Sequence, residues 1–177
     1  MTTNELNTNL TQVTGKLKKE DSKYARIVKG VQIFYWIFIP LFAFKTIRVY
    51  SESGDLKDII SGACITLAFF IIALTFGKYY KEYKYVDYSL PTLEMLKKAA
   101  YRYQPLQKRS VWVLVGMAFM DVGLTFDWMD ENTTVLHTQL FFIGAILVGV
   151  IIGMIWWYIQ YKPLRDDALR LIKELER

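Results

Sequence analysis

The chain has 177 residues, of which 53% are apolar, 16% aromatic and 22% charged, and its formal net charge is +5. This composition excludes a disordered chain, and the gathering of the apolar residues into four long runs excludes a soluble globular domain. One cysteine and one histidine exclude an internal disulfide, a CxxC redox pair and a two-histidine metal site, so we expect no metal and no cofactor.

Residues 1–26 form a polar arm that we expect to be helical. Apolar residues recur in it at spacings of four and three, and the same phase continues into the first apolar run. This pattern predicts one helix that passes from the arm into the membrane. The apolar seam of the arm consists of Leu6, Leu10, Val13 and Leu17. Such a short helix must bury its seam, either against other parts of the chain or against a partner protein or a second copy.

Four apolar runs predict membrane-spanning helices, because a helix pairs all of its backbone groups inside lipid. The expected spans lie at about residues 27–47, 57–77, 107–128 and 138–161. The sequence therefore predicts an all-α integral membrane protein, with a single membrane domain over residues 1–177. Its amphipathic helices at the two ends and an interfacial helix between the second and third spans are expected in the cytoplasm.

Residues 78–106 form a basic, tyrosine-rich segment between the second and third spans. Pro91, shortly after Ser89, predicts a helix over about residues 90–104 that lies on the membrane surface. We expect the basic side chains of this segment to hold anionic lipid headgroups. These side chains are Lys78, Lys81, Lys84, Lys97, Lys98 and Arg102. Nucleic-acid binding through the same lysines and the tyrosines between them is a weaker alternative.

Asp121 is the one acidic residue placed well inside a span, and ionisable residues inside a membrane are functional candidates. It lies in the half of the third span that is level with Lys45 and Arg48 at the end of the first span. We therefore expect a salt bridge to one of these two residues, or a protonated and hydrogen-bonded carboxyl group. A role in passing a proton or a cation is the alternative.

Ala145, Gly149 and Gly153 recur every four positions in the fourth span. Such a stripe of small residues lets two helix backbones approach closely within lipid. It predicts either packing inside the bundle or a seam between two copies of the chain.

The tail over residues 163–177 repeats the amphipathic pattern of the arm. Its apolar stripe includes Leu164, Leu171 and Leu175, and its opposite face carries charges of both signs. Like the seam of the arm, this stripe packs within the chain or docks a partner.

Basic residues fix the expected orientation, since loops rich in Lys and Arg stay in the cytoplasm. Nineteen of the twenty-two Lys and Arg residues lie in the arm up to Lys29, in the central segment up to Arg109 and in the tail. We therefore expect a multi-pass protein of a bacterial inner membrane, with the N-terminus and the C-terminus in the cytoplasm.

Several short stretches are similar to parts of a known group of proteins. They are Glu5–Leu6, Val86–Ser89, Leu93–Lys98 and Leu171–Leu175. In these stretches and in its overall layout, the chain resembles uncharacterised four-span inner-membrane proteins of Bacteroidota that are found beside genes for extracytoplasmic-function sigma factors. The resemblance implies an inner-membrane protein with cytoplasmic arms that is tied to membrane stress signalling.

The sequence contains no GxSxG, P-loop, GxGxxG or HExxH pattern, so we do not expect an enzyme. The favoured hypothesis is a non-enzymatic membrane scaffold or regulatory anchor, whose cytoplasmic helices bind a partner protein or a second copy. The alternative is an oligomeric channel or transporter subunit that uses Asp121.

Overall fold

A computed structural model of the chain describes residues 3–105, 107, 110–128 and 134–176, with side chains from residue 8 onward. The described part is helical and contains no strand. Its helices are α1 (Thr3–Ser53), α2 (Leu56–Lys84), α3 (Thr92–Arg102), α4 (Val111–Trp128), α5 (Val135–Gln160) and α6 (Lys162–Leu175).

Four of these helices, α1, α2, α4 and α5, are long and apolar enough to cross a membrane, as the sequence predicts. The expected continuity of the arm with the first span is confirmed, because α1 is a single helix of 51 residues. At about 1.5 Å per residue such a helix is far longer than the roughly 30 Å of a bilayer core. A bilayer crossed by α1 would therefore cover only part of this helix.

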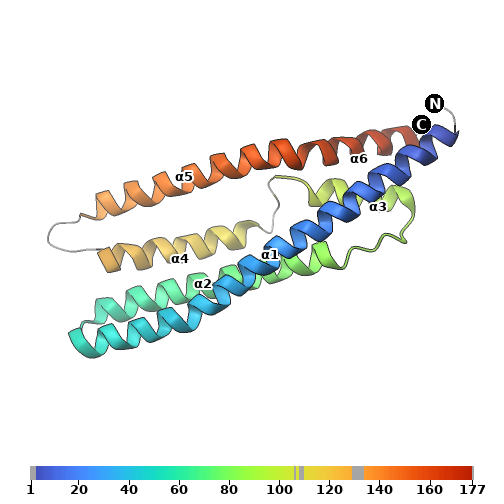
Figure 1. The fold of residues 1–177 in the computed structure, drawn as a ribbon. Coiled ribbons are helices and arrows are strands. Elements are labelled where there is room, and N and C mark those ends of the chain that lie inside the picture. Colours follow the sequence, from blue (N-terminus) through green and yellow to red (C-terminus); the bar gives the residue numbers. More distant parts are fainter. Residues whose placement is uncertain (1–2, 106, 108–109, 129–133, 177) are drawn as a thin grey trace.

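The helices run along the length of an elongated molecule, and the two ends of the chain lie together at one end of it (Figure 1). Helix α2 packs between α1 and α4, whereas α5 lies beside α4 and continues into α6. Near the chain ends, α3 and α6 pack on the first part of α1. We call this assembly the head; it consists of α1 up to Lys29, helix α3 and helix α6.

Small residues allow α2 to approach its neighbours closely. A Cβ atom on Gly123 of α4 would lie 2.6 Å from Cγ1 of Ile65 and 3.0 Å from the carbonyl oxygen of Ser61, both on α2. A Cβ atom on Gly116 would meet Ile72 Cγ1 at 2.7 Å. Helix α2 packs closely on α1 as well, because a Cβ atom on Gly62 would overlap the side chain of Thr46 and one on Gly77 would lie 2.6 Å from Nε2 of Gln32. The close packing in the spans therefore lies on both sides of α2, where glycine lets the helices approach.

The small-residue stripe of α5 does not pack inside the bundle. Ala145, Gly149 and Gly153 are exposed, and a Cβ atom on either glycine would meet nothing within 4 Å. The interpretation of this stripe as an internal packing face is therefore wrong. Gly149 and Gly153 line a cavity of about 880 Å³ that lies between this part of α5 and residues of α1 and α2.

The head has its own apolar core. Its fully buried side chains include Leu17 of α1, Leu96 of α3 and Leu171 of α6. Helix α3 presents Met95, Leu96, Ala99 and Ala100 to this core. The expected helix on the lipid surface is thus a helix packed on protein, because α6 covers the apolar side that lipid was expected to cover.

Candidate functional site

A buried ion pair joins two distant parts of the head. Asp21 on α1 is only 1% exposed, and Nη2 of Arg102, at the end of α3, donates to its Oδ2 at 2.9 Å. Arg102 is itself 7% exposed, so both charges are removed from water. Such a pair is tolerated only when the remaining oxygens of the carboxylate find donors as well.

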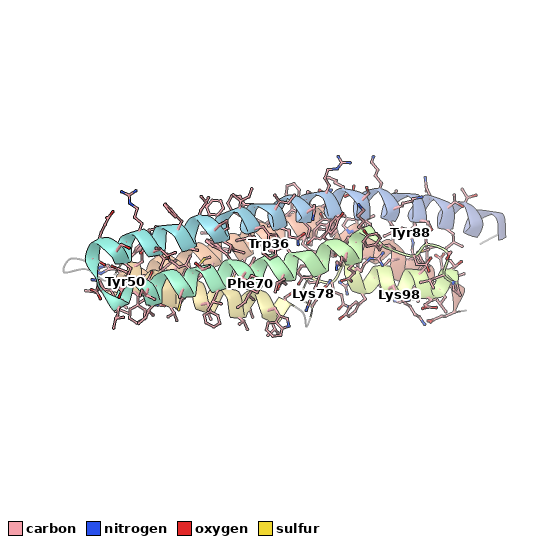
Figure 2. All side chains as sticks on the ribbon, turned by 90° about the horizontal axis from the view of Figure 1, so that it is seen from below. Trp36, Tyr50, Phe70, Lys78, Tyr88 and Lys98 are labelled. Atoms are coloured by element: carbon pink, nitrogen blue, oxygen red, sulfur yellow. The ribbon has the colours of Figure 1, made fainter. Side chains whose placement is uncertain are left out.

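Two tyrosines supply those donors. The hydroxyl of Tyr103 donates to Oδ1 of Asp21 at 2.6 Å, and the hydroxyl of Tyr88 donates to Oδ2 at 2.5 Å. Tyr88 belongs to the connection between α2 and α3, and Figure 2 shows it beside α1. One carboxylate therefore holds together α1, the end of α3 and the connection that leads into α3.

Burial also changes the acidity of these tyrosines. Desolvation raises the pKa of Tyr103 far above its ordinary value, and the negative charge of Asp21 and its hydrogen bond raise it further. The pKa of Tyr88 is raised for the same reasons, with desolvation as the largest. Both phenols thus stay protonated and act as hydrogen-bond donors over the whole physiological pH range.

Further bonds tie this cluster to the spans. Nε1 of Trp157, near the end of α5, donates to the carbonyl oxygen of Tyr103 at 2.8 Å. The hydroxyl of Tyr83 on α2 donates to the carbonyl oxygen of Arg102 at 2.8 Å. The amide of Gln160 on α5 donates to the carboxylate of Glu20 at 3.0 Å. The head is therefore fixed to α2 and α5 as well as being continuous with α1.

The structure places the six expected headgroup ligands in two different environments. The prediction that Arg102 is a headgroup ligand is wrong, because its guanidinium points into the head and pairs with Asp21. The five lysines of the set are exposed. Two of them pair with a carboxylate: Lys97 lies 2.7 Å from Glu176, and Lys98 lies 2.8 Å from Glu94.

The two apolar seams pack on each other and on α3. Val13 and Leu17 share one core with Leu164 and Leu171, and Leu10 and Leu175 pack against that core. Of the two alternatives for these seams, the structure has internal packing, so these leucines are not a docking surface. The side chain of Leu6 lies outside the described residues.

Asp121 does not pair with either expected cation. Nζ of Lys45 lies 3.4 Å from Asp127, and Nε of Arg48 lies 3.0 Å from Glu52 one turn away. The carboxylate of Asp121 instead accepts a hydrogen bond of 3.0 Å from the amide of Gln139 on α5. The structure therefore contains a hydrogen-bonded Asp121 in place of the expected salt bridge to Lys45 or Arg48.

The amide of Gln139 has a second acceptor, the hydroxyl oxygen of Thr125, which is also 3.0 Å away. The Thr125 hydroxyl in turn donates to the carbonyl oxygen of Asp121. These bonds join α4 to α5 inside the spans.

Two grooves flank α1 in and just below the head. The α1–α6 groove has a volume of about 400 Å³, with Lys16, Lys19, Glu20, Ile159, Leu164 and Asp167 in its lining. The α1–α2 groove has a volume of about 850 Å³, and its lining includes Lys18, Asp21, Arg26, Lys29, Tyr80 and Lys84. The α1–α2 groove carries an excess of basic side chains over acidic ones, whereas the lining of the α1–α6 groove has two of each.

Known family models, curated protein sequences and solved structures were compared with the chain, and none of them matches it.

Sequence reasoning missed Asp21 and Gln139. Asp21 lies four residues after Leu17 and four before Ala25, on the apolar seam itself. A charged residue at such a position is a signal for a buried partner of opposite charge. Gln139 lies in the first turns of an apolar helix, where a polar residue within lipid indicates a polar partner on a neighbouring span.

Proposed function

We propose that the chain is a non-enzymatic membrane scaffold or regulatory anchor, which holds its head at the cytoplasmic face of a bacterial inner membrane for a partner protein to bind. The supporting observation is that the head is rigidly joined to the spans. Helix α1 runs unbroken from Thr3 to Ser53, and one residue, Tyr161, separates α5 from α6. A flexible tether needs no such continuity.

The buried pair of Asp21 and Arg102 also supports this role. Burying two charges gives little or no net stability, but it fixes which helices meet and in which register. A protein that only had to anchor itself in lipid would not need a head with a defined register. A binding platform does need it, because its surface must be presented in one geometry.

The α1–α6 groove is the surface that we assign to the partner. Lys16 and Lys19 lie along one side of it, and Leu164 and Ile159 give it an apolar part. Glu20 and Asp167 also line the groove, but they pair with Lys23 and Arg170, whereas Lys16 and Lys19 make no ion pair with any residue that the structure describes. Lys16 and Lys19 are exposed. This combination fits a helix or an extended segment of a cytosolic protein that carries acidic residues beside an apolar anchor.

The alternative, a channel or transporter subunit built around Asp121, has weaker support. The carboxylate of Asp121 accepts a hydrogen bond from Gln139. Lys45 and Arg48, the two basic residues expected at the same depth in the membrane, pair with other carboxylates. These contacts favour a role for Asp121 in joining α4 to α5.

The test begins with a photoreactive amino acid at Lys19 in intact cells and, as a control, at the lipid-facing Ile151. We expect one protein to cross-link at position 19 and none at position 151. The purified partner should then bind the full chain in nanodiscs at a fixed stoichiometry. Lys16→Glu with Lys19→Glu should weaken that binding, whereas Lys97→Glu with Lys98→Glu, the same charge change on α3, should not.

Two results would overturn the proposal. One is the absence of any protein cross-link at position 19. The other is a flux of ions or solutes into proteoliposomes that is lost in Asp121→Asn, which would support the transporter instead.

A further inference from the structure

The α1–α2 groove concentrates positive charge. Lys18, Arg26 and Lys29 line it from α1, and Lys84 lines it from the end of α2. None of these four makes an ion pair with any residue that the structure describes. The carboxylate of Asp21 also borders the groove, but its charge is balanced by Arg102. The groove as a whole is therefore cationic and lacks a counter-charge.

Tyr80 brings two of these cations together. Nζ of Lys29 lies 5.0 Å from the centre of the Tyr80 ring, and Nζ of Lys84 lies 5.4 Å from the same point. The electron-rich face of an aromatic ring attracts an ammonium group, so Tyr80 contacts one cation from each of the two helices that form the groove. Two ammonium groups that contact the same ring repel each other, and an anion that contacts both would relieve that repulsion.

The groove extends from the head into the apolar part of α1. Its lining continues from Lys29 to Gly30 and Ile33, which lie within the first span expected from the sequence. Ile33 is exposed, and a Cβ atom on Gly30 would meet nothing within 4 Å. A ligand that fills the groove must therefore carry a negative charge at one end and an apolar chain at the other.

We propose that the α1–α2 groove binds one anionic phospholipid, with its phosphate between Lys29 and Lys84 and its acyl chain along Gly30 and Ile33. Arg26 and Lys18 contact the outer part of the headgroup. Such a site forms only in the folded protein, because its lysines come from two different helices, α1 and α2. The proposal does not depend on the anchor role, since the partner surface lies in the α1–α6 groove.

This site differs from the headgroup surface expected from the sequence. That expectation spreads the contacts over Lys78, Lys81, Lys97 and Lys98, which are exposed side chains. Lys97 and Lys98 line a separate groove of about 520 Å³, in which Glu82, Asp87 and Glu94 supply negative charge. Only Lys84 belongs to both sets. The α1–α2 groove instead accommodates a single lipid molecule. Its walls limit the size of the ligand, and two of its cations, Lys29 and Lys84, contact the same ring, that of Tyr80.

Native mass spectrometry of the full chain tests the site. The protein is released from micelles that contain equal amounts of phosphatidylglycerol and phosphatidylcholine, and the retained lipid is counted. We expect one phosphatidylglycerol per chain. Lys29→Gln with Lys84→Gln should weaken retention roughly 30-fold, if each interfacial cation contributes its usual share. Lys97→Gln with Lys98→Gln removes the same charge from α3 and should leave retention unchanged.

A second pair of variants covers the case in which the first does not fold, as judged by its near-ultraviolet circular dichroism. Lys18→Gln with Arg26→Gln changes exposed side chains of the same groove, and we expect it to weaken retention too. The proposal is overturned if folded variants of the groove keep the lipid, or if the α3 control loses it equally. Displacement of the lipid by inorganic phosphate would also overturn it, because the ligand would then be a soluble anion.

Discussion

Asp21 and Arg102 lie 81 positions apart in the chain, yet Nη2 of Arg102 and Oδ2 of Asp21 are 2.9 Å apart in the interior of the head. The pair turns three separate segments into one unit. Loss of either residue would lower the free energy of unfolding, because the remaining charge would be buried without an opposite charge.

The first prediction concerns this pair. Arg102→Met leaves the Asp21 carboxylate buried with only two tyrosine donors, and we expect it to lower the free energy of unfolding by about 3–5 kcal/mol. Asp21→Leu with Arg102→Met removes both charges and should cost less than Arg102→Met alone. Thermal unfolding in detergent, followed by near-ultraviolet circular dichroism, measures both. A double variant less stable than the single variant would contradict the role given to the pair.

The second prediction is a loss of stability at alkaline pH. The pKa values of Tyr88 and Tyr103 are raised in the folded head, whereas in the unfolded chain they return to about 10. Above pH 10 the unfolded state therefore binds fewer protons than the folded state, so the free energy of unfolding falls as pH rises. Below pH 10 both states are protonated, and this contribution stays constant.

The ultraviolet absorbance of tyrosinate follows this transition. Tyr88 and Tyr103 should ionise together with the unfolding of the head, and not before it. Tyr103→Phe removes one of the two ionising groups, so the free energy of unfolding should fall less steeply with pH above pH 10. Tyr101→Phe, on the exposed side of α3, is the control and should leave the slope as it is. Ionisation of both buried tyrosines in a folded head would contradict the prediction.

The third prediction separates the glycines of α4 from those of α5. Gly123→Ala places a methyl group 2.6 Å from Ile65 and 3.0 Å from a backbone oxygen of α2, so we expect it to destabilise the spans by about 1–3 kcal/mol. Gly149→Ala meets open space and should be neutral in a monomer. Unfolding in mixed micelles with increasing dodecyl sulfate compares the two. Equal effects of both substitutions would argue against the packing described for α2 and α4.

The fourth prediction concerns the polar contact between α4 and α5. Gln139→Leu removes the donor that serves both Asp121 and Thr125, and it should destabilise the bundle by about 1 kcal/mol. Asp121→Asn keeps an acceptor oxygen for Gln139 and should destabilise the bundle less than Gln139→Leu does. A double-mutant cycle between Asp121→Ala and Gln139→Leu should give a non-zero coupling energy. The same cycle between Asp121→Ala and Lys45→Ala should give none, because Lys45 pairs with Asp127.

The sequence alone identified the helices that can span a membrane and predicted that the arm continues into the first of them as one helix. These features follow from local composition and from a periodicity that every residue of the segment carries, so no tertiary information was needed. It also showed that the arm and the tail each have an apolar side that must be covered. The orientation and the membrane remain predictions from the distribution of Lys and Arg.

Only the tertiary structure decided what covers each apolar side and what each polar group contacts. The arm and the tail bury their seams against each other and against α3, and Arg102 turns inward to Asp21. Asp121 meets Gln139 instead of Lys45 or Arg48, and the glycines that pack closely lie on α2 and α4 instead of α5. Periodicity shows that a helix has a side to bury, but it carries no information about the distant segment that meets that side. That choice depends on how all six helices fit together at once.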